Sequence, residues 1–308
     1  MDEKPVVVGV DGSEHSERAL AWALAAAQQL GVPLVVAHVR SEALQLGEAR
    51  ISSLGESPNI PDTVLNGVAA WIEGQDTPRV PVRYESLDGT VPDALLDSAR
   101  TARLLVTGSR GRGGFASLLL GSVSRSLASS APCPVVVVPH EARTVTPEDG
   151  AEAGRVLVGL HPEETADEVL DFAFHAAEQR GVTLEVVTAY RLPPSPVMLV
   201  GPPAPALQVP PALPLDGDTP ELVRDTVRLQ DERLRPFTER YPDVTVAPTV
   251  VPADAAGRLV EGSRSADLVV VGRHRRHRVT SLLIGSVAHA VLHHAHCPVA
   301  VVPPAAAS

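Results

Sequence analysis

The chain is poor in aromatic residues and in cysteine, and both shortages narrow what it can be. Only 3% of its 308 residues are Phe, Trp or Tyr, and two are cysteines, Cys133 and Cys297. Each cysteine directly precedes a Pro-Val segment. We expect both thiols to be small buried residues, because the cytosol does not favour a disulfide and no base that would activate a thiol is evident.

Positive charge is scarce as well. Lys and Arg number 26 against 37 Asp and Glu, which gives a net charge of −11 and a field that repels nucleic acid and anionic membranes. No run of about 18 uncharged apolar residues occurs outside one proline-broken stretch, so no membrane-spanning helix is predicted. The opening MDEKP is not a basic and apolar export signal, and we therefore expect a cytoplasmic protein.

The chain does contain an internal repeat that covers its whole length. VVVGVD at Val6–Asp11 returns 150 residues later as VLVGLH at Val156–His161, and Cys133 returns 164 residues later as Cys297. The longer second spacing is explained by a proline-rich insertion at 193–215. The repeat predicts two domains, each large enough for its own core. We place them at residues 1–140 and 155–308, with a polar linker at 141–154.

Each unit alternates apolar strands with amphipathic helices. Val6–Val10 is a continuous apolar run, a helix follows from Ser13 to Gly31, and Leu34–Val39 is the second strand. This alternation predicts an α/β fold with two tandem doubly wound open-sheet domains, each a five-stranded, mainly parallel, Rossmann-like sheet. We expect the first and fourth strands to be neighbours where the winding reverses. A ligand would bind beyond their carboxyl ends.

The turn after the fourth strand carries a glycine pattern. It reads Gly108-x-x-Gly111, nine residues, and then Gly121-Ser122. Glycine allows a positive φ or a close backbone approach to phosphate, and the following helix N-terminus adds partial positive charge. With VGVDGSE after the first strand and a His-Val pair closing the second, the pattern resembles the ATP-binding signature of the universal stress protein family. The resemblance covers both repeats and implies the tandem two-domain form.

The resemblance implies a role for each matching residue. It places Asp11 near ribose or a Mg²⁺ ion bound with the nucleotide, and the Val39 backbone beside adenine. Gly108 and Gly111 would follow the ribose and first phosphates, and the start of the next helix would hold the β- and γ-phosphates. The implied ATP-binding set is Gly9, Val10, Asp11, Val39, Thr107, Gly108, Arg110, Gly111, Gly121, Ser122, Val123 and Ser124.

The second repeat departs from this pattern. Three features of the first repeat are replaced: Asp11 by His161, Gly111 by Arg275 and Ser124 by Ala288. We expect a weaker site there, formed by the remaining matches Gly159, Gly272, Gly285, Ser286 and Val287. The basic run Arg273–Arg278 adds cations beside the same helix end, so another anion remains an alternative ligand.

Histidines near the C-terminus include His289 and His293, four apart on a predicted helix. No nearby Glu or Cys completes a ligand set and the HExxH pattern is absent, so we interpret them as solvated helix surface rather than a metal site.

The implied function is that of an ATP-binding regulatory protein of the stress response, in which nucleotide occupancy controls conformation or partner contacts. Two alternatives stay open. One is a slow ATPase or phosphotransferase, although no P-loop lysine and no base beyond Asp11 is evident. The other is an interaction scaffold with a vestigial pocket, which fits the second repeat better. As partners we expect ATP and an unidentified regulatory protein, with a homodimer as a further alternative. The last strands, Val135–Val138 and Val299–Val302, are expected to pair within one chain.

Overall fold

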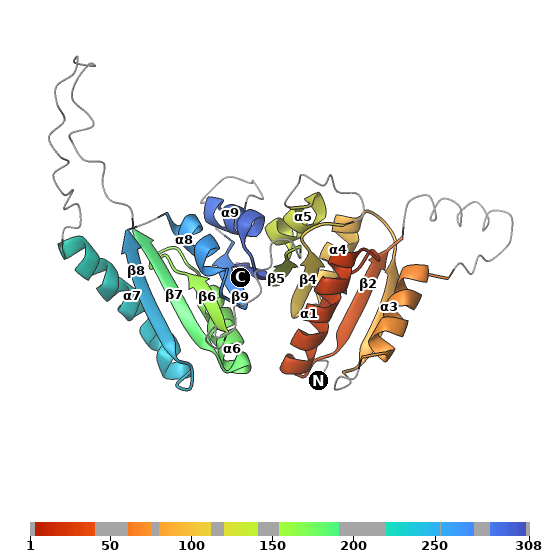
Figure 1. The fold of residues 1–308 in the computed structure, drawn as a ribbon, viewed down its shortest axis with the longest axis horizontal. Coiled ribbons are helices and arrows are strands. Elements are labelled where there is room, and N and C mark those ends of the chain that lie inside the picture. Colours follow the sequence, from red (N-terminus) through yellow and green to blue (C-terminus); the bar gives the residue numbers. More distant parts are fainter. Residues whose placement is uncertain are drawn as a thin grey trace, which may run out of the picture.

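The computed structural model describes residues 4–40, 61–75, 80–111, 120–140, 154–190, 220–252, 254–273 and 284–305. These residues form one ten-stranded sheet with the order β3-β2-β1-β4-β5-β10-β9-β6-β7-β8 (Figure 1). The first five strands come from the N-terminal half of the chain and the last five from the C-terminal half. The predicted α/β, Rossmann-like fold with two tandem domains is confirmed.

The N-terminal domain contains five strands and four described helices. Their order is β1 (Val6–Gly9), α1 (Glu14–Leu30), β2 (Leu34–Val39), α3 (Thr63–Glu73), β3 (Val82–Leu87), α4 (Val91–Ala99), β4 (Leu104–Gly108), α5 (Ser122–Ser130) and β5 (Val135–Val138). The C-terminal domain follows the same plan. Its elements are β6 (Arg155–Gly159), α6 (Asp167–Arg180), β7 (Thr183–Tyr190), α7 (Pro220–Arg240), β8 (Val246–Pro252), α8 (Ala255–Gly262), β9 (Leu268–Gly272), α9 (Ser286–His294) and β10 (Val299–Val302).

The central strands are apolar along their whole length because helices cover both faces of the sheet. On one face α1, α3, α6 and α7 pack against a cluster that runs through both domains. On the other face α4, α5, α8 and α9 do the same. A strand buried on both sides has no solvent-facing positions to fill with polar residues, which explains the near-continuous Val and Leu of β1, β4 and β5.

Local signals set the helix boundaries. The side chain of Ser13 accepts a hydrogen bond from the Ser16 N–H at the start of α1, and Gly31 ends that helix with a φ of 65°. Asp62 caps α3 in the same way, accepting from the N–H groups of Val64 and Leu65. These signals lie within a few residues of each boundary, which is why the sequence pattern predicts the elements to within one or two residues.

The two domains are joined through their last strands. β5 and β10 pair antiparallel, with Val136 opposite Ala300 and Val135 opposite Val301. This confirms the predicted pairing within one chain. It also leaves neither apolar strand as an open edge to which another chain could add.

Side chains from both domains cross this seam. Arg180 of α6 lies over the Trp22 ring of α1, 5.8 Å from its centroid. Nη2 of Arg103 lies 3.1 Å from Nε2 of His175. Nη1 of Arg273 donates a hydrogen bond of 2.8 Å to the carbonyl of Ala131 in the N-terminal domain. The first cation of the predicted anion-binding run therefore reaches the other domain, and residues 274–278 lie outside the described part.

The two cysteines match their prediction. Both are buried and unbonded to each other. Burial raises the pKa of the Cys133 thiol to about 11 and that of the Cys297 thiol to about 12. Both thiols are thus protonated at neutral pH and behave as small apolar side chains.

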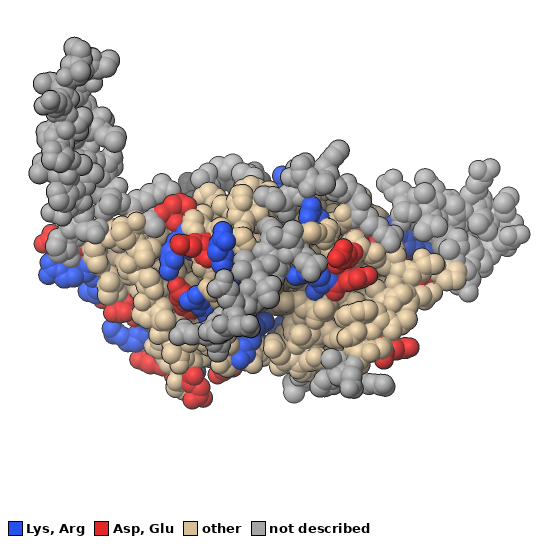
Figure 2. Space-filling view, in the orientation of Figure 1, with Lys and Arg blue, Asp and Glu red and all other residues tan. Residues whose placement is uncertain are grey.

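On the face drawn in Figure 2, Lys and Arg side chains of the described residues are interspersed with Asp and Glu rather than gathered into one patch. Ion pairs among the described residues include Arg155 with Glu185 at 2.9 Å and Arg258 with Glu261 at 3.2 Å. Among the described residues no helix is both long and apolar enough to cross a bilayer. The insertion at 193–215 and all of the linker except Gly154 lie outside the described residues, so the domain boundaries stay a prediction.

His175 makes the stability of this seam depend on pH. Burial, together with the nearby Arg103 charge, lowers the pKa of His175 below its usual value. The unfolded chain therefore takes up the proton first, so the stability contribution is complete above the ordinary histidine pKa and is lost as the pH falls below it. We expect His175→Gln, whose amide oxygen still accepts from Arg103, to lose less stability than the parent between pH 7.5 and 5.5. Urea unfolding at both pH values measures this, and equal losses in the two proteins would contradict the assignment.

Candidate functional site

A cavity opens at the carboxyl ends of β1 and β4. These strands are parallel neighbours, with Val6 opposite Leu104, as the winding rule predicts. The cavity measures about 500 Å³, within the range of small-molecule sites. All twelve residues predicted for the N-terminal site line it, although they come from four separate stretches of sequence. Five further lining residues were not predicted: Ser16, Ala37, His38, Val91 and Leu95.

One end of the cavity is formed by the start of α5. Gly121 is the N-cap of this helix, and no side chain caps it. The N–H groups of Ser122, Val123 and Ser124 belong to the first turn of α5, and N–H groups in a first turn have no acceptor within the helix. A helix start of this kind presents donors and partial positive charge to an anion.

Gly108 is where the backbone approach is closest. A Cβ at this position would lie 2.8 Å from the carbonyl oxygen of His15 in the first turn of α1. The loop glycines thus serve by their lack of volume. The predicted alternative, a positive φ, is wrong for Gly108, Gly111 and Gly121, because the described glycines with positive φ are Gly12, Gly31, Gly89 and Gly181.

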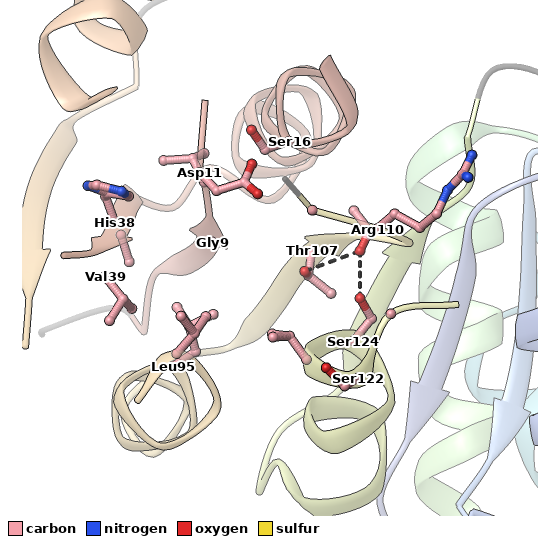
Figure 3. A pocket seen from close by; sticks show the side chains of 17 residues that line it. Gly9, Asp11, Ser16, His38, Val39, Leu95, Thr107, Arg110, Ser122 and Ser124 are labelled. Carbon is pink, nitrogen blue, oxygen red and sulfur yellow. Dashed lines mark hydrogen bonds between the residues drawn. The ribbon is translucent and has the colours of Figure 1, made fainter. Parts of the chain in front are cut away.

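Two hydroxyls bond to the carbonyl at the end of β4, one from α5 and one from the strand itself. Ser124 Oγ donates to the Gly108 carbonyl at 2.7 Å, and Thr107 Oγ1 donates to the same oxygen at 3.3 Å (Figure 3). Both side chains are buried. The resemblance implies a phosphate-binding hydroxyl at Ser124. In the structure its single proton is used to tie α5 to β4, so its contribution is to position the loop.

Asp11 joins the first turn of α1 to the glycine loop. Its Oδ1 accepts from the backbone N–H of Ser13 at 3.0 Å and from Ser13 Oγ at 2.6 Å. A Cβ on Gly111 would lie only 2.6 Å from Oδ2 of Asp11. The Asp11 carboxylate therefore favours a glycine at position 111, because it occupies the space that a side chain there would take.

The other end of the cavity is mostly apolar. Ala37 and Val39 come from β2, whereas Val91 and Leu95 come from α4. Leu95 packs so closely that a Cβ on Gly9 would lie 2.9 Å from its Cδ1. In Figure 3, His38, Val39 and Leu95 lie at this end, away from Ser122 and Ser124 at the helix start. The site thus has a polar end suited to an anion and an apolar end suited to a flat ring.

Two histidines and an arginine stand beside the polar end. The His15 and His140 rings meet edge to face with centroids 4.4 Å apart. Burial, followed by the His140 and Arg110 charges, lowers the pKa of His15. His15 is therefore neutral at pH 7, and the formal cation contributed to the cavity lining is Arg110. Its guanidinium points away from Asp11, Ser122 and Ser124 in Figure 3.

The C-terminal domain repeats this frame but changes its polar contacts. Gly159 and Leu259 repeat the Gly9–Leu95 contact, with a Cβ at 2.8 Å. Gly272 ends β9, and Gly285 is again an N-cap without a side-chain bond, followed by Ser286 and Val287 in the first turn.

The two hydroxyls at the end of β4 have no counterparts at the end of β9. Val271 and Ala288 stand where Thr107 and Ser124 are in the first domain. The Ala288 change was predicted, whereas the Thr107-to-Val271 change was not.

The helix that follows the first strand also begins differently in this domain. The backbone N–H of His161 donates to Thr165 Oγ1 at 2.8 Å, where the first domain has the Asp11–Ser13 contacts. α6 begins at Asp167 rather than at Glu164, the counterpart of Glu14, and its N-cap Ala166 has no side-chain bond. The chain therefore enters the helix about one turn later beside the second site. Arg275 lies outside the described residues.

Among the described residues, no group of three or more His, Cys, Asp or Glu side chains is arranged to hold an ion. The rings of His289 and His293 lie 4.5 Å apart on α9.

Comparisons with known proteins agree with this architecture. The model of the Universal stress protein family matches residues 3–139 and 152–303. A protein named universal stress protein from Mycobacterium tuberculosis is 36% identical over 96% of both chains. Another from Mycolicibacterium smegmatis is 32% identical over 98% of both. Among solved structures, a universal stress protein from Archaeoglobus fulgidus has a TM-score of 0.62 at 18% identity, covering 97% of this chain and 98% of that one.

Alanine substitutions at Gly108 and Gly121 test at which of the two positions the lack of a side chain matters. At Gly108 an alanine Cβ meets backbone at 2.8 Å, whereas at Gly121 its nearest neighbour is 3.4 Å away, an ordinary contact. We expect Gly108→Ala to cost about 1–3 kcal/mol of unfolding free energy. Gly121→Ala should change it by less than about 1 kcal/mol. Urea denaturation of both variants tests this, and equal losses would mean that the β4–α1 approach relaxes freely.

Proposed function

The chain belongs to the universal stress protein family, and on that premise we propose that its N-terminal domain binds ATP and acts as a nucleotide-occupancy sensor. The observation that carries the proposal is the uncapped start of α5 facing the cavity beside Gly108. This position suits an anion, because the first N–H groups of α5 and the positive end of its dipole face the same space and no side chain caps them.

The cavity's two ends suit the two parts of a nucleotide. The N–H groups of Ser122, Val123 and Ser124 would hold phosphate oxygens, with the Gly108 loop kept in place by Thr107 and Ser124. Ala37, Val39 and Leu95 would contact the base. Asp11 contributes a carboxylate to the lining. We propose that the site binds ATP together with Mg²⁺, since the cation would offset the repulsion between this carboxylate and the phosphates.

The lining also supports a sensor rather than a fast enzyme. Of the described residues that line the cavity, Asp11, His38 and Arg110 are the ones that carry a titratable or permanently charged group. None of them is a lysine placed on a phosphate in the manner of a P-loop. Nucleotide occupancy would instead act through the positions of α1 and α5, which both begin at the site.

We propose that the second domain is the weaker site. It lacks the hydroxyl contacts at the end of β9 and begins α6 later, as described above. Because β5 and β10 join the two domains, the second domain would respond to nucleotide binding in the first.

Binding is tested by a charge placed at the helix start. Aspartate is a good N-cap, so Gly121→Asp should keep the fold while its carboxylate takes the N–H donors and repels phosphate. We expect ATP affinity to fall at least about tenfold, because hydrogen bonds to a charged group are each worth about 1.5–3 kcal/mol. The matched control is Gly285→Asp at the equivalent N-cap of α9. Calorimetry with Mg-ATP should give about one tight site per chain in the parent and in the control. If Gly121→Asp bound ATP as the parent does, the site assignment would be wrong.

Turnover is expected to be slow. We expect steady-state ATP hydrolysis well below about one per second, a rate that is ordinary for enzymes. Phosphate release from the purified chain measures it, with Gly121→Asp as the blank for contaminating activity. A rate above that value that disappears in Gly121→Asp would replace the sensor with an ATPase.

A further inference from the structure

Another cavity lies where the two domains meet, between α1 and α6, and measures about 110 Å³. In Figure 1 the lower ends of these two helices lie next to each other at the seam. The cavity reaches Leu104, the first residue of β4, whereas the candidate nucleotide site lies at Gly108, the last residue of that strand. The two cavities are therefore at opposite ends of the sheet, and they share no lining residue.

The wall of this cavity is mostly apolar. Trp22, Ala26 and Leu30 come from α1, whereas Phe172 and Ala176 come from α6. Residues four apart lie on the same face of a helix, so one face of each helix lines the cavity. Because an apolar cavity of about 150 Å³ takes up a benzene ring, one of about 110 Å³ suits a small ring or a short alkyl chain.

Two arginines also line the cavity, Arg103 before β4 and Arg180 at the end of α6. Nη1 of Arg180 donates to the Ala176 carbonyl at 3.0 Å, and its guanidinium lies 5.8 Å from the centroid of the Trp22 ring. Nη2 of Arg103 lies 3.1 Å from Nε2 of His175, and because a guanidinium only donates, the imidazole nitrogen accepts. None of these contacts involves a carboxylate.

The positive charge of the two arginines is not paired within the described part of the chain. Burial lowers the pKa of Arg180, and the Asp267 charge acts in the opposite direction without forming an ion pair. Glu178 lies 3.7 Å from Nδ1 of His175 rather than on either guanidinium. A cation in the last turn favours a helix, but burying one is costly unless it is paired. The cavity thus presents two cations to an anion, in a chain whose net charge is −11.

We propose that this cavity binds a small carboxylate with an apolar body. The carboxylate would pair with Arg103 and Arg180, because the planar guanidinium matches its two oxygens. The apolar body would lie against Trp22 and Phe172. A neutral ring would leave the two cations unpaired, and an inorganic anion would bury no apolar surface. The ligand would contact both domains, and this inference does not depend on the proposed nucleotide site.

The experiment uses benzoate as the probe. Benzyl alcohol has the same ring without the charge, and inorganic phosphate has charge without a ring. Binding is followed by the fluorescence of Trp22 in the full chain carrying Trp71→Phe, which leaves Trp22 as its one tryptophan. Benzoate should bind with a dissociation constant of about 1 mM or below, which is ordinary for a ligand of this size. The other two probes should bind at least about tenfold more weakly, because each lacks one kind of contact.

Three substitutions in the same background locate the site. Arg103→Gln and Arg180→Gln each remove one guanidinium and should weaken benzoate binding at least about tenfold. Arg103 is exposed, so its variant is informative even if Arg180→Gln disturbs the packing on Trp22. The matched control is Arg100→Gln, which changes the net charge equally. Its side chain is 75% exposed and does not line the cavity, so it should bind benzoate as the parent does.

Several results would overturn the proposal. They are the lack of a saturable response to benzoate, equal affinity for benzyl alcohol or for phosphate, and parental affinity in Arg103→Gln. An equal loss in Arg100→Gln would also overturn it, because the effect would then come from the overall charge. Circular dichroism on each variant confirms that a lost response does not come from a lost fold.

Discussion

The N-terminal site depends on how closely the end of β4 passes the first turn of α1. At Gly108 the space beside the backbone is taken by the His15 carbonyl, 2.8 Å from where a Cβ would be. Gly121 is held beside this point, because its N–H donates to the Ser109 carbonyl at 2.7 Å. This bond keeps the start of α5 at the cavity, where the donors of its first turn are available to a ligand.

The two domains share this frame and differ in the groups added to it. Parallel sheet, covering helices and uncapped helix starts occur in both, because they follow from apolar strands and short loops. Hydroxyls at Thr107 and Ser124, and the carboxylate of Asp11, occur only in the first. Losing them costs little in folding, because Val271 and Ala288 fill similar space in the core, yet it removes the contacts that shape the loop. A duplicated domain can in this way keep its structural role, here the antiparallel β5–β10 seam, while its pocket diverges.

Much of this was predictable from sequence for physical reasons. Buried strands have continuous apolar runs, helix caps act within three residues, and glycines mark the backbone approach, so the twelve predicted residues all line the cavity. Val91 and Leu95 were not predicted as lining residues. The amphipathic pattern of α4 predicts a buried face, but it does not show that this face packs against Gly9. The 2.7 Å hydrogen bond between Nδ1 of His38 and Oδ2 of Asp62 was missed because the two residues are 24 positions apart. The sequence around Asp62 indicates only a helix cap. Arg273 was misplaced because its acceptor, the Ala131 carbonyl, belongs to the other domain.

The central claim is that the first domain holds the tight nucleotide site of the chain. It is tested most directly by saturating the purified chain with Mg-ATP, desalting it, denaturing it, and identifying the released small molecules by mass spectrometry. Our account predicts about one adenine nucleotide per chain. Release of none, or of two equivalents per chain, would contradict it: the first outcome would remove the site, and the second would show that the two domains are equal despite their different polar contacts.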